Sequence, residues 1–208
     1  MESVRCGRER GAASGLVTTP HIRRARSATQ RDTPALFGVE TGKTEAGEKV
    51  YPLTGGWTMQ LKEVAIHQFE QAQQMLEIQR NAYAVEAELL GFDEIPARYE
   101  TIDVIQNLPG TSYGLYIEER LIGFVTVEAS EKTVEITKLC IDPTYFRARL
   151  ATTLLEHILS IHKGKLIYVH TGKHNGPAKR LYTKLGFEPS AKFEPEHGVT
   201  LIRYTHTS

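Results

Sequence analysis

The sequence contains little cysteine, and this limits the chemistry that it can carry. Its 208 residues include two cysteines, Cys6 and Cys140, which are far apart and lack the short spacing of metal ligands. A disulfide framework and a cysteine-rich zinc site are therefore excluded, and no metal site is predicted. We interpret both residues as reduced thiols of a cytoplasmic protein.

Long apolar runs and an excess of one charge are also missing. No apolar stretch approaches the ~20 residues that are needed to span a bilayer, so no membrane partner is expected. Lysine and arginine together number 25, and so do aspartate and glutamate. A balanced chain has no overall attraction to nucleic acid or to an anionic membrane, so nucleic acid is not an expected partner either.

The first 58 residues lack the periodic apolar pattern of helices and strands. They contain seven arginines before Asp32. This composition is typical of an organelle transit peptide, and also of a disordered leader, a non-native added segment or a start codon placed too early; we favour the last three. The segment Gly42-Lys43-Thr44 resembles a phosphate-binding P-loop, but Phe37 stands where that motif needs glycine.

From Met59 onward, the apolar pattern predicts regular elements. Alternation indicates strands, and apolar residues three or four apart indicate helices. The expected strands are 60–66, 113–117, 121–128, 134–141, 166–170, 188–193 and 200–204, and the expected helical segments are 68–90, 97–107, 150–159 and 175–185. Because no repeat or linker interrupts this part, we predict one domain over residues 59–208.

The strand at 134–141 has an irregular pattern. Val134 and Ile136 alternate, whereas Leu139 and Ile141 alternate on the opposite phase. A slip of one residue turns every later side chain to the other face, so the strand is either buried on both faces or carries a β-bulge near Thr137. A bulge leaves backbone N–H groups available to a ligand.

The helix after this strand begins beside two arginines, Arg147 and Arg149. The first N–H groups of a helix lack internal acceptors and carry partial positive charge. Such a strand–turn–helix is able to bind phosphate. An anion site and an ordinary turn with two solvated arginines both fit this stretch.

A second motif follows the strand at 166–170. Asn175 is a favourable N-cap, Pro177 suits a first helical turn, and Gly186 is the expected left-handed stop. The motif reads Asn175-x-x-Ala178-x-x-Leu181-Tyr182-x-x-x-Gly186-Phe187. Together with the order of elements, it resembles the GNAT superfamily of acyl-CoA-dependent N-acetyltransferases.

The resemblance implies an α/β (α+β) fold, with a mixed, strongly twisted sheet of about seven strands flanked by about four helices. Strands 134–141 and 166–170 are expected to splay apart, so that the pantetheine arm of acetyl-CoA lies between them. The backbone contacts implied for that arm are Leu139, Cys140 and Ile141, with Asn175 as a further contact. The amides implied for the pyrophosphate are those of Arg147, Ala148, Arg149, Leu150, Ala151 and Thr152.

The expected phosphate loop departs from the family pattern Arg/Gln-x-x-Gly-x-Gly/Ala. The matching positions are Phe146, Arg149 and Ala151. If Arg149 has helical φ and ψ, it adds a charge-assisted contact to phosphate; if it needs a positive φ, binding is compromised. Arg149 therefore motivates an alternative function, a catalytically weak CoA-binding sensor or interaction module.

The implied reaction is direct acetyl transfer from acetyl-CoA to a primary amine. An amine of pKa ~10 is protonated at pH 7, so a base must take a proton, and the departing thiolate benefits from an acid. Tyr182 matches the acid of the family. Glu135, acting through a water, is the expected base, and His170 is its rival. Cys140 is either an acyl-accepting nucleophile or a small buried residue without a chemical role, and we favour the second interpretation.

The acceptor is left open by the sequence. Acidic residues in the helical region suit a cationic amine, and a solvated helix face also explains them; they are Glu86, Glu88, Asp93 and Glu94. A small-molecule amine, an amino acid, an antibiotic, and a protein N-terminus or lysine all fit. Monomer and homodimer are both open as well.

Overall fold

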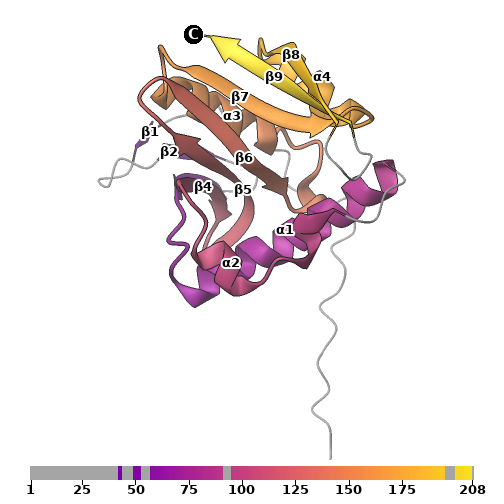
Figure 1. The fold of residues 1–208 in the computed structure, drawn as a ribbon. Helices are drawn as coiled ribbons and strands as arrows, with labels where there is room; N and C mark the ends of the chain where they lie inside the picture. Colours follow the sequence, from indigo (N-terminus) through magenta and orange to yellow (C-terminus); the bar gives the residue numbers. More distant parts are fainter. Residues whose placement is uncertain (1–41, 44–48, 53–56, 91–94, 195–199, 208) are drawn as a thin grey trace, which may run out of the picture. The chain divides into compact units, whose positions relative to one another are not determined.

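A computed structural model describes residues 42–43, 49–52, 57–90, 95–194 and 200–207 (Figure 1). Its elements, in chain order, are β1 (Gly42–Lys43), β2 (Lys49–Pro52), β3 (Thr58–Glu63), α1 (Phe69–Leu90), the 3₁₀ turn η2 (Pro96–Tyr99), α2 (Ile102–Gln106), β4 (Thr111–Ile117), β5 (Arg120–Ala129), β6 (Thr133–Ile141), η3 (Pro143–Tyr145), α3 (Leu150–Ile161), β7 (Leu166–Gly172), α4 (Gly176–Lys184), β8 (Glu188–Phe193) and β9 (Leu201–Thr207). None of the described helices is long and apolar enough to cross a membrane.

The described strands form one mixed sheet in the order β1-β2-β3-β4-β5-β6-β7-β9-β8. Neighbouring strands are antiparallel, except for β6 and β7, which are parallel. A parallel pair needs a crossover connection, and α3 supplies it. The predicted α/β (α+β) fold is confirmed, with a sheet of nine strands rather than about seven.

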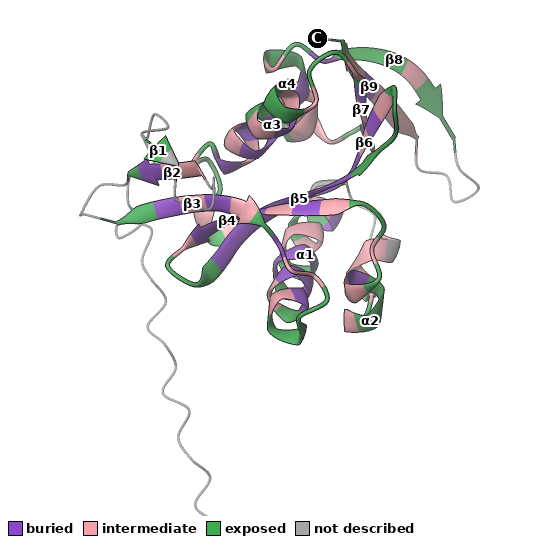
Figure 2. Cartoon of the chain, turned by 90° about the vertical axis from the view of Figure 1, so that its left-hand side faces the viewer, coloured by how far each residue is buried: buried purple, intermediate pink, exposed green. Residues whose placement is uncertain are grey.

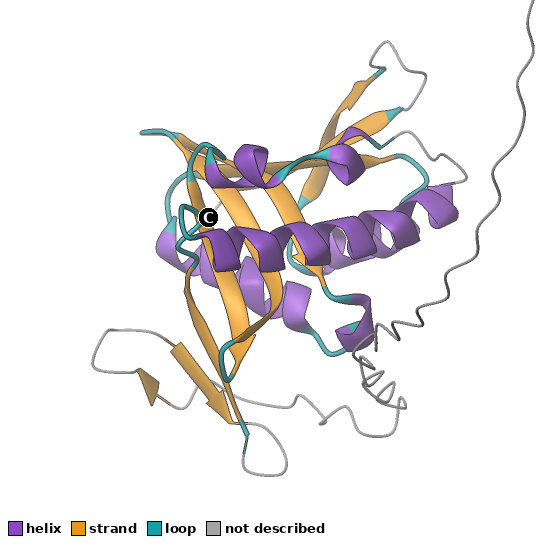
Figure 3. Ribbon diagram, turned by 90° about the horizontal axis from the view of Figure 1, so that it is seen from below, coloured by secondary structure: helices purple, strands orange, loops and turns teal. Residues whose placement is uncertain are grey.

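Helices cover both faces of the sheet (Figure 2). On one face, α1 buries Ala72, Met75 and Leu76, whose spacing of three and four places them on one stripe. On the other face, α3 buries Leu154 and Ile158 by the same rule, and α4 packs into the same core. The view from below shows helices crossing the strands (Figure 3).

A β-bulge in β6 explains the phase slip in its sequence. Thr126 of β5 pairs with Lys138 and Val127 pairs with Ile136, so Thr137 is the extra residue. Ile136 therefore packs in the core beneath α3, whereas Cys140, four residues later, packs beneath α1. The bulge hypothesis is confirmed.

The sheet begins upstream of the expected domain boundary. β2 pairs with β3, and Tyr51 is buried in the core beside Met59. Residues 42–43 and 49–52 therefore differ from the expectation of a disordered leader over 1–58, since β1 pairs with β2 and β2 pairs with β3. Strands of two and four residues are too short to show an alternating apolar pattern in the sequence. Residues 1–41 lie outside the described part, so for them the expectation stays a prediction.

The single helical segment expected at 97–107 is interrupted. Glu100 and Thr101 are extended between η2 and α2. Glu100 thereby reaches the ammonium group of Lys138, with Nζ–O distances of 2.9 and 2.8 Å. A tertiary ion pair, which periodicity cannot show, accompanies the break in this helix.

Candidate active site

β6 and β7 separate partway along their length, as expected. They pair only from Thr133–Ile136 to Leu166–Val169. Beyond Ile136, β6 continues to pair with β5 as far as Ile141, while β7 pairs with β9 as far as Gly172. The edge of β6 that carries residues 137–141 therefore has no paired strand on its β7 side within the described residues.

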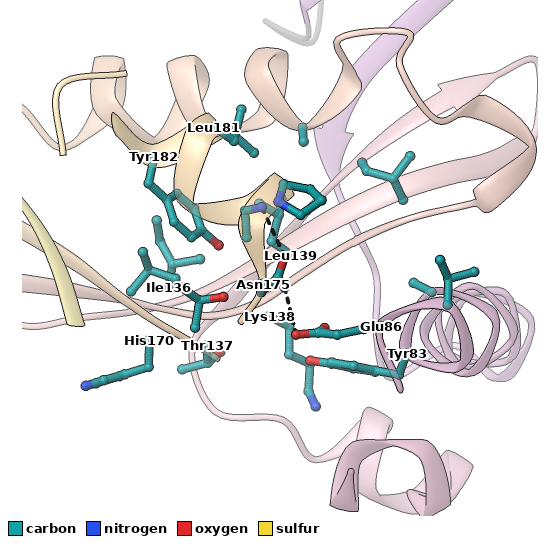
Figure 4. A pocket seen from close by; sticks show the side chains of 18 of the residues that line it. Tyr83, Glu86, Ile136, Thr137, Lys138, Leu139, His170, Asn175, Leu181 and Tyr182 are labelled. Atoms are coloured by element: carbon teal, nitrogen blue, oxygen red, sulfur yellow. Dashed lines mark hydrogen bonds between the residues drawn. The ribbon is translucent and has the colours of Figure 1, made fainter. Parts of the chain in front are cut away.

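A cavity of about 280 Å³ lies in this gap (Figure 4). The residues around it come from both layers of helices and from the two splayed strands. They are Ala82, Tyr83, Val85 and Glu86 of α1; Ile136 to Leu139 and Ile141 of β6; Phe146 and Ala151 beside α3; Val169 to Thr171 of β7; and Asn175, Pro177, Ala178, Leu181 and Tyr182 at α4. Leu139 and Ile141 thus line the cavity, as expected for pantetheine contacts, whereas the Cys140 side chain lies in the core beneath α1.

The predicted phosphate loop presents free backbone amides. No hydrogen bond among the described residues uses the N–H of Arg147, Arg149, Leu150, Ala151 or Thr152 as donor. The exception is the amide of Ala148, which donates to the carbonyl of Tyr145 at 3.3 Å. Asp142, just before the loop, accepts from the amide of Thr144 at 2.9 Å and pairs with Arg120 at 3.0 Å. Its carboxylate therefore does not cap the loop.

Two residues of this loop have left-handed backbones. φ is +66° at Arg147 and +62° at Arg149. A left-handed conformation costs a non-glycine residue about 1–2 kcal/mol, and such strain gathers at functional sites. Of the two alternatives for Arg149, helical φ is therefore wrong and positive φ holds. This is the case in which glycine is normally used, so the hypothesis of weak CoA binding stays open.

Tyr182 joins a buried ring to a hydroxyl that points into the cavity (Figure 4). Its ring centroid lies 5.8 Å from those of Phe187 and Tyr204. The hydroxyl has no hydrogen-bond partner in the described part of the chain. Burial, and then the charge of Glu86, raise the pKa of Tyr182 well above its ordinary value. The hydroxyl therefore keeps its proton at neutral pH and is able to act as a donor.

The two expected bases contact one another. Glu135 Oε1 lies 3.3 Å from His170 Nδ1, and the hydroxyl of Tyr168 donates to Glu135 Oε2 at 3.0 Å. Arg203 Nε donates to His170 Nε2 at 3.1 Å, so Nε2 carries the lone pair and Nδ1 carries the hydrogen toward Glu135. His170 lines the cavity, whereas Glu135 does not. The role of Glu135 as base stays a prediction.

Glu86, for which the sequence allowed either a cationic-amine site or a solvated helix face, lines the cavity. It is half-buried, and Asn175 Nδ2 donates to its Oε1 at 2.8 Å. Burial raises its pKa, and the hydrogen bond from Asn175 opposes this. Asn175 Oδ1 also accepts from the amide of Ala178 at 3.1 Å, which confirms the predicted N-cap. The spacing of Gln79, Tyr83 and Glu86 continues the buried stripe of α1. This spacing was the sequence signal that could have placed Glu86 on the inward face of the helix.

Lys138 of the cavity lining belongs to a largely buried polar cluster. Lys138 pairs with Glu100, and Gln79 Nε2 donates to the same carboxylate at 2.8 Å. Cys140 is 1% exposed, and burial raises its pKa to about 12. A thiol that keeps its proton is a poor nucleophile, so the interpretation of Cys140 as a small buried residue is the better one. Asp93 and Glu94 lie outside the described residues.

These features define a class of protein. Its members have a mixed sheet that splits between two parallel strands, and the split lies beside a helix whose N-terminal amides are free. Residues 72–187 match the model of the Acetyltransferase (GNAT) family. The chain belongs to this family.

Individual proteins are similar to this chain in sequence or in fold. UPF0157 protein YqkA of Bacillus subtilis (strain 168) is 31% identical over 131 residues, which are 62% of this chain and 38% of that protein. The fold resembles PaiA N-acetyltransferase of Thermoplasma acidophilum, solved with coenzyme A, with a TM-score of 0.56 and 17% identity over 71% of this chain and 99% of the other. It also resembles Arabidopsis thaliana NAA60, solved with a bisubstrate analogue, with a TM-score of 0.56 and 20% identity over 71% and 97%.

Proposed function

We propose that this protein transfers the acetyl group of acetyl-CoA to a primary amine in a ternary complex of protein, donor and acceptor. The observation that carries the proposal is the cavity in the β6–β7 gap, which is lined at one side by Phe146 and Ala151 of the phosphate loop and at another by Tyr182. Family membership and a fold shared with proteins solved with coenzyme A or acetyl-CoA support it.

The chain supplies a group for each demand of donor binding. The free amides of the loop at 147–152 suit the diphosphate, since they combine unpaired N–H groups with the positive end of α3. The unpaired edge of β6 at 137–141 suits the amide groups of the pantetheine arm. The thioester carbonyl would then lie near the bulge, where a main-chain N–H is able to stabilise the oxyanion.

Acetyl transfer moves two protons from the acceptor. A base first takes one proton from the ammonium group, and the free amine attacks the thioester carbonyl. When the C–S bond breaks, Tyr182 donates its proton to the departing thiolate. The tyrosinate then recovers a proton from the nitrogen of the new amide. The products are the N-acetylated amine, CoA thiol and one proton held by the base.

A second function, a CoA-binding module with little turnover, is favoured by one observation, the positive φ of Arg149. In this function the Cβ of Arg149 would keep the diphosphate from a close approach to the loop. Binding and turnover distinguish the two functions.

The test is an acceptor screen with the full chain and acetyl-CoA. The panel contains spermidine, free lysine, kanamycin and a peptide with a free N-terminal alanine. Release of CoA thiol is followed together with the mass of each product. Acetylation of any amine above the uncatalysed rate supports the transferase. Saturable acetyl-CoA binding without acetylation of any of them supports the module instead.

A further inference from the structure

We infer that Glu86 of α1 binds the ammonium group of the acceptor and takes its proton, which makes it the general base of the reaction. The inference rests on the proposed function, and it assigns the base to a residue other than Glu135. Four observations carry it, concerning position, charge, neighbours and proton transfer.

The position of Glu86 is inside the cavity. Its side chain extends from α1 toward α4, where Asn175 Nδ2 donates to it at 2.8 Å (Figure 4). The hydroxyl of Tyr182 points into the same cavity from α4. Base and acid would thus reach a thioester in the gap from different elements. Glu135, by contrast, is held by His170 and Tyr168 outside the lining.

Glu86 is the one carboxylate among the described residues of the lining. The other charged or basic groups there are already engaged. Lys138 is paired with Glu100, and both nitrogens of His170 have partners. A cationic amine that enters the cavity therefore finds one anionic side chain to pair with.

The groups that face Glu86 leave it without a counter-ion in the described part of the chain. The titratable neighbours are Tyr83 on its own helix, Tyr182 on α4 and Cys140 on β6. Burial raises the pKa of each of the three, so that all are neutral near pH 7. Among the described residues, the polar contact of Glu86 is the neutral amide of Asn175. A half-buried anion that lacks a cation gains most from binding one.

Proton transfer from the acceptor is favoured by the same burial. The carboxylate accepts one proton from R–NH₃⁺ and becomes neutral, and the amine becomes free to attack. The raised pKa of Glu86 brings this carboxylate nearer to the pKa of the amine, which makes it a stronger base than a solvated glutamate. After product release, the proton passes to water.

The experiment compares Glu86→Gln with Glu88→Gln in the full chain. Glutamine keeps an oxygen for Asn175 and removes only the charge. Glu88 lies on the same helix and is exposed, so it is the matched control. For each protein, kcat/KM is measured against pH with the best amine of the panel (spermidine, lysine, kanamycin or the alanyl peptide), and acetyl-CoA affinity is measured by calorimetry.

We expect Glu86→Gln to lower kcat/KM by about 100-fold or more and to abolish its acidic limb, because protonation of the base no longer limits the rate. Acetyl-CoA affinity should stay within about threefold of wild type, and Glu88→Gln should behave as wild type. Retained turnover in Glu86→Gln, or a parallel loss of turnover and acetyl-CoA affinity, would overturn the inference and leave the proposed function intact. If the wild type binds acetyl-CoA but acetylates no amine, the proposed function and the inference both fail.

Discussion

At the scale of single residues, the two parts of the Tyr182 side chain have different roles: the ring contributes to stability and the hydroxyl to the proposed chemistry. Its ring packs against Phe187 and Tyr204, while its hydroxyl has no partner within the described residues. We expect Tyr182→Phe to lower kcat by about 10²–10⁴-fold, the usual contribution of a positioned acid. Melting temperature and acetyl-CoA affinity should change little, because the ring packing is kept. Steady-state kinetics and calorimetry check this, and an unchanged kcat would reduce Tyr182 to a core residue.

Glu86 makes stability depend on pH with a defined sign. Burial raises its pKa in the folded protein above that of the unfolded chain. The folded state therefore holds this proton more tightly, and the stability so gained is present below the unfolded pKa and lost as pH rises through the folded pKa. We expect Glu86→Gln to be more stable than wild type near pH 7.5, with a gain that disappears toward about pH 4.

Urea unfolding at a series of pH values measures this difference. Glu88→Gln is again the control, because its exposed side chain should give no such pH dependence. A gain in Glu86→Gln that is the same at every pH would contradict a raised pKa for Glu86.

The residues that sequence could identify were those set by local rules. Asn175 was found as an N-cap because capping depends on a backbone amide three residues away, and Gly186 was found because a left-handed stop favours glycine. Glu86 was named only as one of four acidic residues, with a cationic amine and a solvated helix face as alternatives, although its spacing from Gln79 and Tyr83 places it on the buried stripe.

At the scale of elements, the loop before α3 stores strain at Arg149. We expect Arg149→Gly to stabilise the protein by about 1 kcal/mol, because glycine adopts a φ of +62° without penalty. Arg149→Ala removes the same charge but keeps the Cβ, so it should not gain stability. Denaturant unfolding of both variants separates strain from charge, and equal stabilities for the two would refute the role of strain.

The ion pair between Lys138 and Glu100 joins β6 to the segment between η2 and α2. The Lys138 side chain is 8% exposed and that of Glu100 is 22% exposed. We expect Lys138→Met to cost about 3 kcal/mol, because it leaves a half-buried carboxylate unpaired. Glu100→Gln added to it should recover much of that loss. A double-mutant cycle by urea unfolding measures the coupling, and additive losses would show that the pair is not coupled.

Elements whose apolar residues follow a regular spacing were predictable from the sequence, and elements that are very short or shaped by distant contacts were not. The range of α1 follows from its apolar spacing, and the bulge at Thr137 follows from the phase slip in β6. β1 and β2 were missed for another reason: with two and four residues, they are too short to show an alternating pattern. The break between η2 and α2 was missed because Glu100 turns toward Lys138, which is 38 residues away.

At the scale of the whole domain, the split between β6 and β7 brings the two helix layers into contact. α1 from one face and α4 from the other meet at the hydrogen bond between Glu86 and Asn175. A cavity lined by both layers lets a donor and an acceptor approach from different sides. The family resemblance predicted the split itself, while the contact across it emerged from the structure.

Binding of acetyl-CoA to the full chain, measured by calorimetry, tests the central claim most directly. Ala151→Asp places a carboxylate among the free amides of the loop, and Ala151→Asn is its neutral control of nearly the same size. We predict that wild type and Ala151→Asn bind one acetyl-CoA each, and that Ala151→Asp binds at least about tenfold more weakly, because its charge repels the diphosphate. Equal affinities for the two variants, or no binding by the wild type at millimolar acetyl-CoA, would contradict the account.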